Sequence, residues 1–144
     1  MKKLLFIVVV VTLVYGYAQE HGVSIHGLSS LYGGSSGALQ TAYRNRKSNL
    51  QVKGEGIVIR ILPDDLEGSR HQKFILKTST GQTLLIAHNI DLAPRINDIR
   101  NGDVVQFYGE YEWNSKGGAI HWTHHDPNNM HIEGWLKHEG RTYQ

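Results

Sequence analysis

The sequence contains no cysteine. This absence excludes disulfide scaffolds, thiolate zinc sites, iron–sulfur clusters and cysteine nucleophiles. Proline is also scarce, with 3 residues against 16 glycines, and this ratio favours strands and turns over a proline-rich or collagen-like chain. The length of 144 residues suits one domain and is too short for two well-packed ones. What is abundant is histidine, with 9 residues in a chain that offers no thiolate.

Long apolar runs are absent except at the N-terminus, where Leu4–Val14 follows Lys2 and Lys3. Small residues come next at Gly16 and Ala18, and this order is typical of a secretory signal peptide. We therefore expect residues 1–18 to be cleaved and the protein to be periplasmic or secreted, with no membrane span remaining. The run is shorter than the roughly 20 apolar residues that span a bilayer, and an uncleaved anchor is the alternative.

Neither sign of charge is in excess once this segment is removed. The loss of Lys2 and Lys3 from 15 basic residues leaves 13, against 13 acidic residues. An even balance gives no support to broad electrostatic capture of nucleic acid. One basic cluster remains at Arg44, Arg46 and Lys47, and it fits a solvated helix end better than a phosphate-binding patch.

Composition divides the mature chain into a flexible Gly- and Ser-rich leader over residues 19–37 and a single domain over 38–144. A short helix is expected at the start of the domain, because Leu39, Ala42 and their neighbours Ala38 and Tyr43 share one face at helical spacing, with Ser35 or Ser36 as its cap.

After this helix, alternating apolar residues predict five strands. They begin with a long strand from Leu50 to Ile61 that glycines interrupt, and continue with Gln72–Thr78, Thr83–Ala87, Val104–Tyr111 and Ala119–Thr123. A turn or one short helix is expected between the third and fourth strands, and a hairpin around Glu139 and Gly140 ends the chain. This order predicts an all-β, OB-fold-like five-stranded barrel, with another small barrel or sandwich as the alternative.

Four stretches of sequence also carry a family resemblance. They are RHQ at 70–72, LLIAHNIDLAPR at 84–95, GEYEWN at 109–114 and HWTHHDP at 121–127. Together they resemble the bacterial family of domain of unknown function 3465 (DUF3465), over about residues 52–143. The resemblance implies a small secreted bacterial domain. It transfers no catalytic residue.

The densest chemistry lies near residues 121–131. Imidazole and carboxylate ligands suit a divalent transition metal such as zinc, and the candidate ligands are His121, His125, Asp126 and His131. On a strand, His121 and His125 point to one face while Trp122 and His124 point to the other, so Trp122 is expected in the barrel core. The alternative is that these histidines only hydrogen-bond a loop.

A second polar group flanks the second and third strands. Its candidate catalytic residues are Arg70, His71, His88 and Asp91, with His124. Around one pocket they would bind phosphate and activate water, so a metal-dependent phosphodiesterase or nuclease is one hypothesis. The structural alternative pairs Arg70 with Asp64 or Asp65 at the surface and uses Asp91 to cap a turn.

Aromatic residues support a different hypothesis. OB-fold barrels stack bases or sugars on exposed aromatic rings. The predicted fourth and fifth strands and the segments after them carry Tyr108, Tyr111, Trp113, Trp122 and Trp135. We take Tyr111, Trp113 and Trp135 as the candidate ligand-binding residues of an exported binding domain. Its ligand would be an oligosaccharide, a nucleic acid or a small charged molecule. The alternative is that these rings fill the core.

Overall fold

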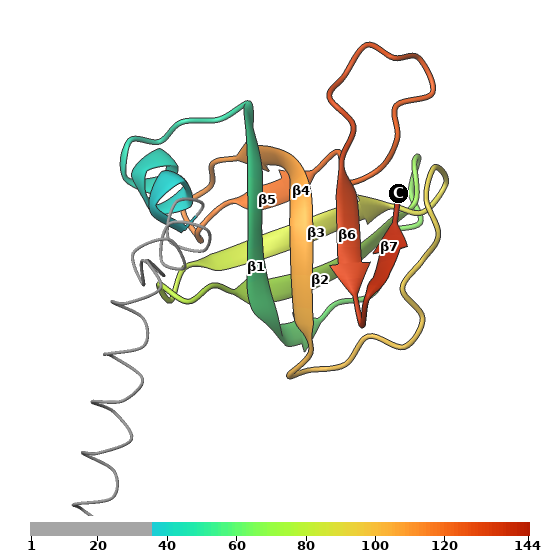
Figure 1. The fold of residues 1–144 in the computed structure, drawn as a ribbon, viewed down its shortest axis with the longest axis horizontal. Helices are drawn as coiled ribbons and strands as arrows, with labels where there is room; N and C mark the ends of the chain where they lie inside the picture. Colours follow the sequence, from blue (N-terminus) through green and yellow to red (C-terminus); the bar gives the residue numbers. More distant parts are fainter. Residues whose placement is uncertain (1–35) are drawn as a thin grey trace, which may run out of the picture. The chain divides into compact units, whose positions relative to one another are not determined.

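A computed structural model describes residues 36–144, and the predicted signal peptide and most of the predicted leader lie outside this range. Residues 36–44 are helical. Seven strands follow (Figure 1): β1 (Leu50–Ile61), β2 (His71–Lys77), β3 (Thr83–Asn89), β4 (Val104–Glu112), β5 (Ala119–His121), β6 (Trp135–His138) and β7 (Arg141–Tyr143).

The first five strands close into a barrel. Their order is β1-β2-β3-β5-β4, and a further pairing between β1 and β4 completes the ring. All neighbours are antiparallel except β3 and β5, which run parallel. β1, β4 and β6 stand side by side in Figure 1, with β2 and β3 crossing behind them. The expectation of an all-β, OB-fold-like barrel is therefore confirmed.

The long first strand serves both halves of the barrel. Leu50–Ile57 pairs with β4, whereas the pairing with β2 begins at Ile57 and shifts register between Val58 and Arg60. Gly54 faces the core, and a Cβ at this position would lie 2.7 Å from the Phe107 ring. Glycine is required there because the ring of Phe107 fills the space that a side chain would need.

The helix packs on the barrel through fewer residues than the sequence suggested. Leu39 and Ala42 are buried, but Ala38 is exposed and Tyr43 is only half-buried. The Tyr43 carbonyl accepts a hydrogen bond from Trp113 Nε1 at 3.1 Å. This bond fixes the end of the helix against the turn that follows β4.

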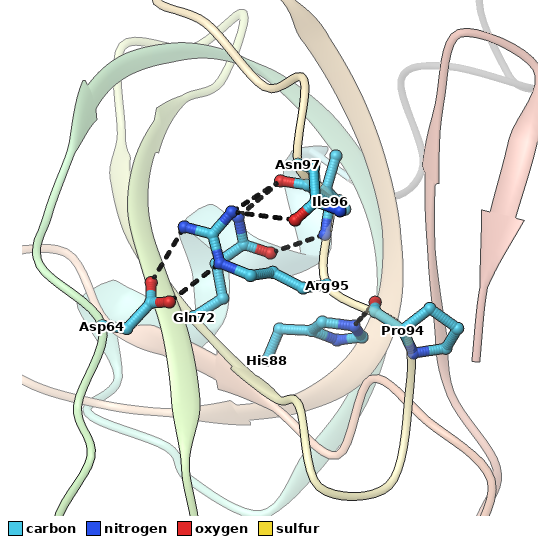
Figure 2. A network of polar contacts seen from close by, with 7 residues as sticks. All are labelled: Asp64, Gln72, His88, Pro94, Arg95, Ile96 and Asn97. Atoms are coloured by element: carbon cyan, nitrogen blue, oxygen red, sulfur yellow. Dashed lines mark hydrogen bonds and ion pairs between the residues drawn. The ribbon is translucent and has the colours of Figure 1, made fainter.

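The connection between β3 and β4 consists of turns without a helix, and buried polar side chains hold it on the barrel. Gln72 donates to the Ile96 carbonyl at 2.8 Å and accepts from the Ile96 amide at 2.9 Å. Figure 2 shows His88 directed at the Pro94 carbonyl and Arg95 directed at the Asp64 carboxylate. Backbone groups that no strand satisfies thus obtain partners from side chains.

The β6–β7 hairpin, which the sequence predicted, extends the sheet beyond the barrel. β6 pairs with the first half of β4, over Val105–Tyr108, while β5 pairs with the second half, over Glu110–Glu112. At the far end of β6, the buried His138 bonds Asp103 at 2.8 Å. The hairpin is therefore continuous with the barrel wall.

The prediction that the fifth strand continues to Thr123, with Trp122 in the core, is wrong. β5 ends at His121, and Trp122 has a φ of 54°, a left-handed conformation that few residues other than glycine adopt. This turn carries the chain out of the barrel, so Trp122 is half-buried and the core position belongs to Ile120.

Within residues 36–144, no helix is long and apolar enough to cross a membrane.

Candidate functional site

The outward face of β4 organises the candidate site. Phe107 and Tyr111 are fully buried, so the alternating residues Tyr108, Glu110 and Glu112 point away from the core. Cross-strand neighbours on this face lie close enough to interact. Two rows of side chains result, one that runs Gln51, Glu110, His121 and one that runs Lys53, Tyr108, Trp135.

The first row contains a compact group of carboxylates and imidazole, here named the Glu–His cluster: Glu110, Glu112 and His121. Their ligand atoms all lie within 4.8 Å of one another. His121 Nε2 is 3.4 Å from Glu110 Oε1 and 3.7 Å from Glu112 Oε1. His121 Nε2 is nevertheless buried without a hydrogen-bond partner. Imidazole and carboxylate at this spacing can share a metal ion.

His131 reaches the cluster from the loop that follows β5. Its Nδ1 donates to the Ile132 carbonyl at 2.8 Å, and its Nε2 lies 2.6 Å from Glu110 Oε2. A carbonyl and a carboxylate only accept, so both ring nitrogens carry protons. Burial lowers the pKa of His131, but the Ile132 carbonyl and Glu110 outweigh burial, and the pKa is raised overall. Trp122 stacks on this ring at 4.1 Å.

Asp126 organises the loop that carries His131. Its carboxylate accepts three backbone hydrogen bonds, from Asn128 at 2.9 Å, Met130 at 2.7 Å and His131 at 2.8 Å. These bonds, with the one from Asn128 foremost, lower the pKa of Asp126. Both oxygens of Asp126 are therefore engaged in holding the backbone of the loop.

The remaining candidates from this loop lie apart from the cluster. His125 Nδ1 is 3.0 Å from Glu133 Oε1, and both side chains are at least half exposed. His124 is buried and donates from Nδ1 to the His125 carbonyl at 2.7 Å. Of the four predicted metal ligands, the structure brings His121 and His131 around Glu110, while Asp126 supports His131 from behind.

The second row forms a surface that we name the aromatic–lysine face: Lys53, Tyr108, Trp135 and Lys137. The two rings are tilted by 41° with centroids 6.1 Å apart. Lys53 Nζ lies 5.5 Å and Lys137 Nζ 4.8 Å from the centroid of the Trp135 ring. Both distances are within the range of cation–π attraction. The face therefore combines ring surface with positive charge.

The other two candidate ligand-binding aromatics occupy different environments. Tyr111 has no exposed surface, and its hydroxyl donates to the Gly117 carbonyl at 3.0 Å. Trp113 is half-buried against the core, with the Arg46 guanidinium 5.4 Å from its ring centroid. Among the three predicted aromatics, Trp135 is the one that lies on the aromatic–lysine face.

The predicted catalytic group is divided between surface and interior. Arg70 donates from Nε to Asp91 at 2.6 Å in an exposed ion pair, whereas the structural alternative paired it with Asp64 or Asp65. His71 donates to the Ser69 carbonyl at 2.7 Å. His88 is fully buried, with Thr123 Oγ1 at 2.8 Å from its Nδ1. Over residues 36–144, no hydrogen bond or ion pair joins these residues to the Glu–His cluster.

Sequence reasoning missed Glu110, Glu112, Lys53 and Lys137 as site residues. Glu110 and Glu112 are separated by two positions in a predicted strand, which places both on one face. The sequence does not reveal that this face adjoins His121 and Gln51, because strand pairing between β1, β4 and β5 decides it.

Comparison with known proteins identifies the family of this chain. A family model described as "Protein of unknown function (DUF3465)" matches residues 23–144. No curated protein matches the sequence significantly.

Proposed function

Since the chain belongs to the DUF3465 family, whose description assigns no activity, we propose from the geometry of the site that it is an exported binding domain. Its ligand docks on the aromatic–lysine face. The observation that carries this proposal is the row Lys53, Tyr108, Trp135, which crosses three neighbouring strands with Lys137 beside it. Export rests on the N-terminal sequence pattern.

The face favours a ligand that has flat rings and negative charge. Aromatic side chains on a sheet stack bases whatever their sequence, and nearby lysines neutralise the phosphates. The lysines now lie over the Trp135 ring, but exposed cation–π contacts are worth only about 0.5–1 kcal/mol. An incoming base can therefore displace them towards its own phosphate. A short single-stranded nucleic acid is the ligand that matches these features best.

The small number of lysines sets the expected character of the binding. Two phosphate contacts to a single strand give a slope of log affinity against log salt of about −1.4. Removal of one lysine should reduce its magnitude by about 0.7. The balanced charge of the mature chain agrees with a short contact rather than a long electrostatic track.

The test is a titration of the tag-free exported protein with a short fluorescent single-stranded oligonucleotide, followed by anisotropy. Replacement Trp135→Ala should weaken binding about 5- to 150-fold, which corresponds to the loss of one stacked base. Trp113→Phe is the matched control, because Trp113 lies against the helix and the core, and it should bind as the wild type does.

Two results would contradict the proposal. One is unchanged affinity of Trp135→Ala. The other is tight binding of an anionic or neutral oligosaccharide together with no binding of the oligonucleotide. The aromatic rings would then stack on a sugar ligand.

A further inference from the structure

The distances from His121 to the two carboxylates of the Glu–His cluster are close to those between the ligands of one metal ion. Zinc binds histidine nitrogen and carboxylate oxygen at about 2.0–2.2 Å in tetrahedral geometry, which separates neighbouring ligand atoms by about 3.4 Å. His121 Nε2 lies 3.4 Å from Glu110 Oε1 and 3.7 Å from Glu112 Oε1. These distances are too long for good hydrogen bonds and suit atoms that share one ion.

Unpartnered polar atoms give a second, independent indication of a ligand. His121 Nε2 is buried without a hydrogen bond, and so are both amide atoms of Gln51. Gln51 and His121 flank Glu110 in the same row on the outward face. Buried polar atoms nearly always have partners, so two neighbouring exceptions call for a group that would satisfy them. A metal ion would take the lone pair of His121 Nε2.

The surrounding loop is built to hold Glu110 in place. His131 binds the carboxylate of Glu110 through Nε2 at 2.6 Å, which leaves the other oxygen of Glu110 directed towards His121. Asp126 fixes the backbone of His131 by a hydrogen bond of 2.8 Å, and the Trp122 ring is stacked on the imidazole. Such outer contacts orient the ligands in protein metal sites.

We propose that Glu110, Glu112 and His121 bind one divalent transition-metal ion of the zinc type. The imidazole in the ligand set suits zinc, copper, iron or nickel, whereas magnesium, calcium and manganese prefer oxygen ligands alone. Three protein ligands leave a fourth position for water or an anionic oxygen. His131 is a positioning residue in this site, and the site is independent of ligand binding on the aromatic–lysine face.

Isothermal titration calorimetry of the full exported chain tests this assignment. The protein is tag-free and treated with chelator, and zinc chloride is the titrant. We expect one zinc ion per chain and at least a hundredfold loss of affinity in His121→Ala. His125→Ala is the matched control, because His125 is an exposed histidine of the adjoining loop that pairs with Glu133 outside the cluster. It should bind zinc within about threefold of the wild type.

Two further variants separate loss of the site from loss of the fold. Glu112→Gln changes one partly exposed carboxylate, and it should lower zinc affinity while the melting temperature of the metal-free protein stays unchanged. His131→Gln should weaken zinc binding about 10- to 100-fold, as expected for a residue that orients a ligand.

The assignment is overturned if zinc fails to bind the wild type. It is equally overturned if His121→Ala and Glu112→Gln bind as well as the wild type, because the ion would then be held by histidines elsewhere.

Discussion

Acidification from pH 7 to pH 4 is expected to destabilise the barrel through His88. His88 belongs to β3, and its side chain is fully buried against the segment that follows β5. Its Nε2 donates to the Pro94 carbonyl at 3.1 Å, and its Nδ1 therefore accepts from the Thr123 hydroxyl at 2.8 Å. The folded protein holds a neutral imidazole because burial penalises the charged form, whereas the Thr123 hydroxyl can bond either protonation state.

The size of the effect follows from the pKa of His88. Burial, opposed in part by the Pro94 carbonyl, lowers this pKa from 6.5 to about 4. Between these values the unfolded chain binds more protons than the folded one, so stability is fully present above pH 6.5 and is lost as the pH falls. The loss is about 3 kcal/mol between pH 7 and pH 4, at about 1.4 kcal/mol per pH unit in the middle of the window.

Urea denaturation at intervals between pH 4.5 and pH 7, followed by tryptophan fluorescence, measures this dependence. His88→Gln supplies a donor and an acceptor but no titrating group, so the fall in stability that His88 causes below pH 6.5 should be absent, and the raised pKa of His131 leaves a dependence of opposite sign. His125→Gln is the control, since His125 is half exposed, and it should keep the wild-type slope. Equal slopes in the wild type and His88→Gln would refute the reasoning.

Three further predictions concern individual contacts. Gln72→Ala leaves the buried backbone groups of Ile96 without partners and should cost about 2–3 kcal/mol in urea denaturation, a result that an unchanged midpoint would contradict. Arg70→Ala removes an exposed ion pair with Asp91 and should leave the midpoint nearly unchanged, because such pairs contribute little. Gly134→Ala places a Cβ against the Trp122 carbonyl and 2.5 Å from the Tyr108 carbonyl. The substitution should lower the melting temperature because it displaces the loop. A wild-type melting curve would show that the loop is not closely packed there.

The barrel was predictable because its signals are local. Alternating apolar residues and glycine-containing turns indicated the first five strands, and the turn at Glu139 and Gly140 indicated the β6–β7 hairpin, as the structure shows. The expectation for Trp122 failed because alternation cannot reveal where a strand ends in a left-handed residue. At that point the backbone conformation of Trp122, and not the pattern of its neighbours, decides the path of the chain.

The candidate site was less accessible to sequence reasoning because pairing creates it. The density of histidines predicted a metal site within residues 121–131, but the carboxylates beside His121 come from β4. The aromatic residues present the same difficulty. Tyr108 and Tyr111 differ by three positions and therefore point to opposite sides of β4, and the structure shows Tyr111 in the core beside Phe107.

The most direct test of the central proposal is to map the binding surface by backbone amide chemical shifts during titration with a single-stranded oligonucleotide. The proposal predicts saturable shifts centred on Lys53, Tyr108 and Trp135, which adjoin one another across β1, β4 and β6. Shifts confined to β2 and β3, or none at saturating concentrations, would contradict it.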